Sequence, residues 1–156
     1  YPVRMVVPGL YGYVSATKWV VDLEVTRFAD KAAYWTQRGW SERGPIKLAS
    51  RIDVPRAGAA VAAGPTTLGG TAWAQTVGID RIEVQIDDGA WQEADLAAEA
   101  NVDTWRQWSL DWQATPGDHT ARVRAVDHNG EQQTSDHANP VPDGATGWHE
   151  THFTVS

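Results

Sequence analysis

The sequence contains no cysteine, one methionine and only two phenylalanines among its 156 residues. Without cysteine, the chain can hold no disulfide framework, no thiolate-ligated metal and no cysteine nucleophile. The redox compartment stays open, because a chain without thiols suits either environment. No apolar run reaches the roughly 20 residues that a membrane-spanning helix needs.

Basic residues are scarce relative to acidic ones. Thirteen lysines and arginines stand against twenty aspartates and glutamates, which gives a net charge of −7. That balance argues against nucleic acid or an anionic membrane surface as a partner. The length and the hydrophobic fraction of 42% fit one ordinary globular domain with a real core.

Tryptophan is in excess, with nine indoles against two phenylalanines. Because large aromatic side chains dominate buried area, we expect most of them to fill the core or interfaces. The alternative is a platform on which a ligand stacks. It predicts two or three coplanar tryptophans on one exposed face.

Alternation of apolar and polar residues predicts β-strands in the second half of the chain. The segments with this pattern are 82–86, 108–112, 121–125 and 151–155. Asp88-Gly89 and Asn129-Gly130 are strong signals for tight turns. The helix-like stretch 95–101 is too short to change this picture.

The first half gives a more mixed pattern. Residues 2–7 and 20–25 predict strands, 34–40 predicts a short helix or turn, and the glycine- and alanine-rich run 57–70 predicts short strands joined by turns. Because the sequence opens directly on a strand-like run, we expect the chain to be cut from a larger protein. Together these patterns predict an all-β fold, an immunoglobulin-like antiparallel β-sandwich of the E-set type.

The five histidines do not form a metal-ligand pattern. His149 and His152 are three residues apart, so a strand would place them on opposite faces. His119 and His128 fall at strand ends, and we expect these histidines to be solvated or hydrogen-bonded. The pair Asp87-Asp88 lies at a hairpin, where turn geometry explains it. We predict no catalytic residue and no metal ligand in this chain.

Two cations near the N-terminus suggest an anion site. Arg4 and Lys18 lie among glycines and small residues, beside loops where the backbone can approach a ligand. Such an arrangement suits a phosphate. Ordinary surface charge also accounts for two cations.

The same residues carry a resemblance to the sulfite oxidase family of molybdopterin enzymes. The run 2–9, followed by Gly12 and Lys18-Trp19, resembles the stretch that closes the molybdopterin site in that family. Segment 34–38 is similar to the family's bridge containing Trp and Gln. Further segments that resemble family markers are 70–73, 105–108 and 148–149.

The resemblance implies an organisation for the chain. Residues 1–28 would be the C-terminal edge of the molybdopterin-binding domain, 29–47 a connecting segment, and 48–156 the immunoglobulin-like dimerisation domain. The parent would be a bacterial-type oxidoreductase that transfers oxygen between water and a small oxyanion. Its partners would be a second copy of the sandwich and the preceding cofactor domain. Relatives often work outside the cytoplasmic membrane, sometimes tethered to it.

The resemblance also implies the cofactor-binding residues. Arg4 and Lys18 match positions that contact the pterin or its phosphate, and Ala16 and Thr17 match neighbours whose backbone lines the same pocket. Molybdopterin is therefore expected in the parent enzyme. We expect this chain alone to hold no cofactor and no catalytic centre.

Four departures from the family pattern bear on the substrate and the site. The molybdenum-ligating cysteine and a cofactor-contacting histidine are absent from the chain, and one residue is inserted before Lys18. Ahead of Trp148 the family places an arginine that reaches the substrate pocket, whereas residues 139–143 read Asn-Pro-Val-Pro-Asp. Loss of that cation weakens binding of a dianion, so sulfite is not the expected substrate.

Two other functions are compatible with the pattern of strands. One is a free-standing immunoglobulin-like module that binds carbohydrate or protein through exposed tryptophans. The other is an adhesion or spacer domain of a surface protein. The binding-module reading leaves the N-terminal segment without a purpose.

Overall fold

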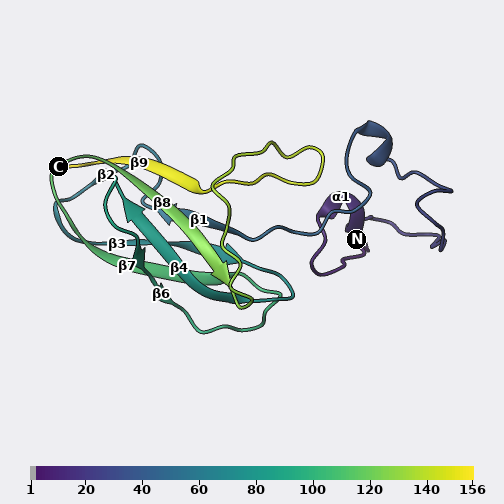
Figure 1. The fold of residues 1–156 in the computed structure, drawn as a ribbon, viewed down its shortest axis with the longest axis horizontal. Helices are drawn as coiled ribbons and strands as arrows, with labels where there is room; N and C mark the ends of the chain where they lie inside the picture. The colour runs from purple at the N-terminus through teal and green to yellow at the C-terminus, as the bar shows by residue number, and fades with distance from the viewer. Residues whose placement is uncertain (1–2) are drawn as a thin grey trace.

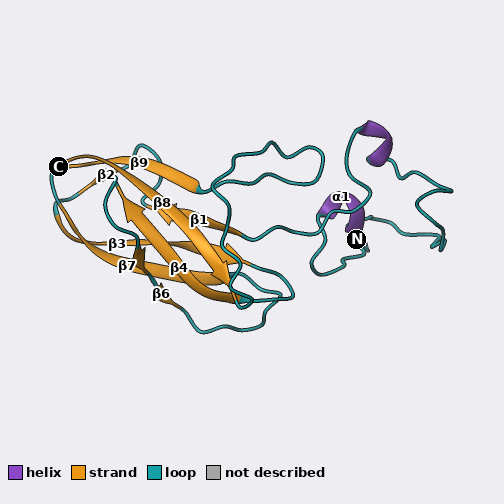
Figure 2. Cartoon of the chain, in the orientation of Figure 1, coloured by secondary structure: helices purple, strands orange, loops and turns teal. Residues whose placement is uncertain are grey.

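The computed structural model describes residues 3–156, which form a two-layered β-sandwich with irregular segments at one end (Figure 1). Figure 2 shows the strands gathered in the sandwich and both helices outside it. The strands are β1 Ala49–Val54, β2 Ala60–Val61, β3 Gly64–Trp73, β4 Ile79–Ile86, β5 Gln92–Glu93, β6 Asp95–Leu96, β7 Arg106–Ala114, β8 Gly117–Asp127 and β9 His149–Val155. The helices are α1 Gly12–Ser15 and a 3-10 turn, Thr36–Arg38.

The two sheets have the orders β1-β3-β7-β6 and β2-β9-β8-β4-β5. Antiparallel pairing dominates, and the short β2 alone among these strands pairs in parallel, with β9. Each sheet buries one face against the other, so alternate residues along a strand face the core. The prediction of an all-β, immunoglobulin-like sandwich is confirmed.

Aliphatic side chains fill the space between the sheets. The largest fully buried ones are Leu68, Ile82, Val84, Val123 and Val126. The expectation that most indoles fill the core or interfaces is wrong for the core, where Trp108 is buried and Trp112 packs against it. Trp108 is buried, but the other tryptophans are half-buried or exposed. Several of them lie on outer sheet faces or in the segments before β1.

Three predicted elements differ from the structure. Pro2 lies outside the described residues, and 3–7 forms one isolated bridge instead of a strand. Segment 20–25 forms neither helix nor strand and pairs with no described strand, and Val21 and Val25 are each 97% exposed. The helix-like stretch 95–101 instead begins with β6, because Asp95 and Leu96 pair with β7.

The turns follow the sequence prediction. Asp87–Gly89 joins β4 to β5, and the 3-10 turn falls within the predicted segment 34–40. The glycine-rich run 57–70 contains β2 and the first part of β3. No helix within residues 3–156 has the length and apolarity required to cross a membrane.

Candidate functional site

The structure brings two of the sequence-predicted site residues together. Arg4 and Lys18 oppose each other in an isolated antiparallel bridge. The flanking backbone hydrogen bonds run from Met5 N–H to Thr17 C=O (3.0 Å) and from Trp19 N–H to Val3 C=O (2.8 Å). Residues directly opposite in an antiparallel pair project their side chains to the same side. The bridge therefore presents two cationic side chains on one face.

No described carboxylate neutralises this pair. Arg4 and Lys18 are exposed, and neither forms an ion pair within residues 3–156. Like charges directly opposite each other on paired strands repel. An anion placed between them would relieve that repulsion, so the bridge has the chemistry of a phosphate site.

Ala16 and Thr17 connect α1 to the bridge. Ala16 N–H donates to Gly12 C=O at 3.0 Å and ends the single helical turn. Thr17 is exposed, and Ala16 is half-buried. The structure thus places all four predicted residues in one short stretch of surface around the bridge.

Trp19 adds a feature that the sequence did not reveal. Its backbone is left-handed, with φ of 55°, and its side chain is 64% exposed. This conformation is costly for a bulky residue and concentrates at functional sites. A left-handed tryptophan leaves no signal in local sequence, so only the structure could show it.

A contact that we call the tyrosine clamp fixes this segment to the rest of the chain. It comprises Tyr11, Tyr13, Trp40, Gly44 and Gly144. Tyr11 N–H donates to Gly44 C=O at 2.8 Å, and the rings of Tyr13 and Trp40 lie 4.7 Å apart. The glycines permit this approach. A Cβ on Gly44 would lie 2.6 Å from the Tyr13 hydroxyl, and one on Gly144 would lie 2.5 Å from the Tyr11 ring.

The loop between β8 and β9 reaches the tyrosine clamp (Figure 1). Ser41 N–H donates to Pro142 C=O at 2.7 Å, and Lys47 Nζ donates to Asp143 Oδ1 at 2.9 Å. Burial, followed by the charge of Asp143, raises the pKa of Tyr13. The segment 139–143, where the family places its substrate-pocket arginine, therefore lies against the candidate site segment.

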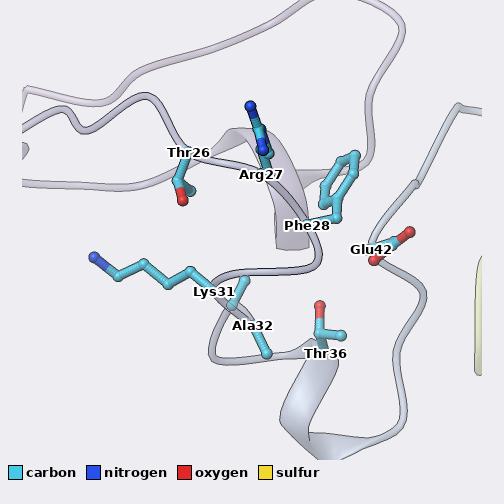
Figure 3. A pocket seen from close by; sticks show the side chains of 8 residues that line it. Thr26, Arg27, Phe28, Lys31, Ala32, Thr36 and Glu42 are labelled. Carbon is cyan, nitrogen blue, oxygen red and sulfur yellow. The ribbon is translucent and has the colours of Figure 1, made fainter.

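A separate pocket of about 440 Å³ lies within the segments before β1 (Figure 3). Its lining side chains come from Thr26, Arg27, Phe28, Lys31, Ala32, Ala33, Thr36 and Glu42. Figure 3 shows Lys31 extending away from Phe28 and Glu42. None of the four predicted site residues lines this pocket.

Four of the five histidines form side-chain hydrogen bonds and His137 is exposed, as expected of solvated or hydrogen-bonded histidines. The contacts are His119 with Asp87 and Thr115, His128 with Ile79, His149 with Ile52, and His152 with Thr120. His149 Nδ1 accepts the Ile52 N–H at 3.2 Å. Burial, then the nearby charge of Arg51, lowers the pKa of His149. Within residues 3–156, no three potential ligands gather into a metal site.

The exposed-tryptophan alternative finds limited support in the geometry. The sandwich carries one stacked pair, Trp73 and Trp105, with centroids 5.6 Å apart and ring planes at 28°. Trp105 is exposed and Trp73 half-buried. The other exposed indoles, Trp19 and Trp35, lie in the segments before β1.

Comparison with known proteins gives two family matches. Residues 1–35 match the model of the oxidoreductase molybdopterin binding domain, and residues 49–123 match that of a bacterial Ig domain. No curated protein sequence gives a match.

Two solved structures illustrate the structural likeness. The sulfane dehydrogenase SoxCD from Paracoccus pantotrophus has a TM-score of 0.51 and 26% identity, over 58% of this chain and 24% of that chain. The fibronectin(III)-like modules of CbhA from Clostridium thermocellum have a TM-score of 0.42 and 17% identity, over 69% of this chain and 95% of that chain. This chain spans less than two thirds of the SoxCD chain that it matches.

Proposed function

We infer that this chain, a sulfite-oxidase-like segment joined to an immunoglobulin-like domain, forms the cofactor-site rim and the dimerisation domain of a molybdopterin oxidoreductase. The molybdopterin context rests on the family match over residues 1–35 and on the likeness to SoxCD. The activity of the whole protein and its self-association are our proposals.

The observation that carries the proposal is the bridge between Arg4 and Lys18. These residues fit the group that the family implies. Two neighbouring cations without a described carboxylate partner can hold a phosphate, and Thr17 beside them is exposed, which leaves room for a ligand to approach. When bound, molybdopterin would supply the redox chemistry, while the protein binds and orients it. Arg4 and Lys18 would neutralise the phosphate.

The proposed substrate is a reduced sulfur compound other than sulfite. Segment 139–143 holds no arginine. Lys47, the cation that contacts the loop between β8 and β9, already forms an ion pair with Asp143. A dianion would therefore find no free arginine or lysine on the loop. The name of the sulfane dehydrogenase indicates a reduced sulfur substrate for that enzyme, which supports this class.

Replacing both bridge cations tests the cofactor role. In the full-length enzyme, Arg4→Ala/Lys18→Ala should weaken retention of the pterin by roughly 100-fold or more, because each charge-assisted hydrogen bond contributes about 1.5–3 kcal/mol. Molybdenum and pterin content after extensive dialysis gives the measurement. The matched control, Arg43→Ala/Arg56→Ala, removes the same charge elsewhere and should leave retention unchanged. Equal retention in both double variants contradicts the assignment.

A further inference from the structure

The outer face of the four-stranded sheet carries side chains that the core does not use. Arg51 on β1 lies opposite Thr71 on β3, which in turn lies opposite Gln107 on β7. The alternate residues Ile52 and Trp108 are buried. Because neighbours along a strand point to opposite faces, Arg51, Thr71 and Gln107 project away from the core.

This face carries an open groove of about 470 Å³ that is lined by both apolar and polar residues. Polar side chains in its lining are Asp53, Thr71, Asp95, Gln107 and Ser109. Gly69 contributes to the lining without a side chain. A Cβ on Gly69 would make only an ordinary contact, at 3.4 Å from the Trp108 carbonyl oxygen. The strand could therefore carry a larger residue at Gly69. Such a side chain would fill part of the groove.

An indole lies outside the lining of the groove, two residues before Gln107, and contacts Arg51 of the same face. Trp105 is 58% exposed and stacks on Trp73. The Arg51 guanidinium carbon lies 5.3 Å from the Trp105 ring centroid. Arg51 Nε also donates to Asp53 Oδ1 at 2.7 Å. Arg51 thus links the aromatic pair to a carboxylate of the groove and restricts the orientation of the exposed indole.

The chemistry of the lining selects the ligand. The carboxylate of Asp95 forms no ion pair within residues 3–156 and repels phosphates and other anions. Asp53 is held by Arg51 and by the Thr71 hydroxyl, at 3.4 Å, and no trio of metal ligands is present in residues 3–156. Carboxylates accept hydrogen bonds from hydroxyl groups, while amide and hydroxyl side chains both donate and accept. An indole face packs against apolar C–H surface. A neutral sugar combines hydroxyl groups with such a surface, and the groove has the size of a small-ligand site.

We propose that this groove binds a short neutral oligosaccharide. One sugar ring packs on Trp105, and hydroxyl groups of the neighbouring units donate to Asp53 and Asp95. This site lies on the immunoglobulin-like domain and does not depend on the molybdopterin assignment. Its failure would leave the cofactor proposal intact.

Calorimetric titration of the full chain with cellohexaose, mannohexaose and maltohexaose tests the site. At least one hexasaccharide should bind at millimolar concentration or below. Trp105→Ala should weaken that binding by roughly tenfold, because it removes the aromatic surface. Gly69→Val should weaken it at least as much by filling the groove. Trp35→Ala removes an exposed indole far from the groove and should leave affinity unchanged.

The variants keep the test independent of folding. Valine suits a strand, and the only atom within 4 Å of a Cβ on Gly69 is the Trp108 carbonyl oxygen at 3.4 Å, so Gly69→Val should unfold at or near the temperature of the parent chain. Weakened binding in Trp105→Ala and Gly69→Val, with Trp35→Ala unaffected, supports the site. The proposal is overturned by the absence of binding to all three hexasaccharides. It is equally overturned by binding that survives both groove variants or that Trp35→Ala abolishes.

Discussion

Local contacts shift the pKa values of the His119 imidazole and the Asp87 carboxylate in opposite directions. His119 Nδ1 lies 3.0 Å from Asp87 Oδ2, and Nε2 lies 2.7 Å from Thr115 C=O. The hydrogen bond to Asp87, then that to Thr115, raises the pKa of His119. Burial by itself would raise the pKa of Asp87, but the N–H of Thr120 and the His119 ring outweigh it and lower that pKa. Both shifts favour the ion pair.

Replacing Asp87 by asparagine should destabilise the fold most in mildly acidic solution. The contribution of His119 is fully present below its unfolded pKa of about 6.5 and is lost as the pH rises through the raised folded value. That of Asp87 is present above about 3.9 and is lost as the pH falls through the lowered folded value. Urea unfolding should therefore show a larger loss for Asp87→Asn near pH 5 than near pH 9. NMR titration should show the His119 pKa falling.

Asp88→Asn provides the matched control for this prediction. Asp88 is the next residue of the same turn, and its side chain is 98% exposed. Asparagine tolerates the left-handed backbone at position 87, where φ is 54°, so Asp87→Asn should keep the turn. A His119 pKa that responds equally to both variants, or to neither, would contradict the pairing.

At the same scale, the sequence suggested candidate residues but not their geometry. Cations among glycines and small residues suit an anion, but ordinary surface charge explains them equally, and Arg4 and Lys18 were selected through the family resemblance. Nothing in local sequence indicates that two such residues form a bridge, because that pairing depends on the path of the chain between them. The left-handed Trp19 is a further result of that path.

The N-terminal segment packs on the loop between β8 and β9 through a contact that only glycine permits, between the Tyr11 ring and Gly144. Gly144 has φ of 108°, and its missing Cβ leaves space for the Tyr11 ring. Gly130 also has a positive φ, of 81°, but a Cβ there would meet nothing within 4 Å. Replacing Gly130 by alanine would therefore add backbone strain alone, whereas replacing Gly144 would add backbone strain and a steric clash.

Gly144→Ala should release the N-terminal segment while the sandwich stays folded. The new methyl group would strike the Tyr11 ring, so amide hydrogen exchange in residues 9–15 should accelerate by roughly tenfold or more. Exchange in the β8 and β9 core should change little. Gly130→Ala carries the backbone cost of about 1–2 kcal/mol alone and should leave exchange in residues 9–15 as it was. If both variants left that exchange unaltered, the clamp would not hold the segment.

Strand prediction succeeded where a strand finds its partners within the chain. Segments 82–86 and 121–125 show period-two alternation, and β4 and β8 pair with each other. Segment 20–25 has a comparable pattern but no partner in the described residues. Segment 95–101 resembles a helix in sequence, but its first two residues, Asp95 and Leu96, form a strand that is too short for periodicity to reveal. Alternation reports which face of a strand is apolar, but pairing decides whether it becomes a strand.

For the whole molecule, the proposed dimer predicts a particle mass of two protomers that does not change with protein concentration. Light scattering of the full-length protein should give twice the protomer mass over a wide range of concentration. The sandwich should be the region that maintains it, as the family resemblance implies. A monomer mass for both the full-length protein and this chain at high concentration would rule out self-association through the sandwich.

The metal and pterin content of the full-length protein tests the central claim most directly. Protein produced with molybdenum cofactor available should contain close to one molybdenum and one extractable pterin per protomer, because residues 1–35 match the model of a molybdopterin-binding domain. Protein produced under the same conditions that contains neither would contradict the enzyme assignment. The likeness to molybdopterin oxidoreductases would then be one of structure alone.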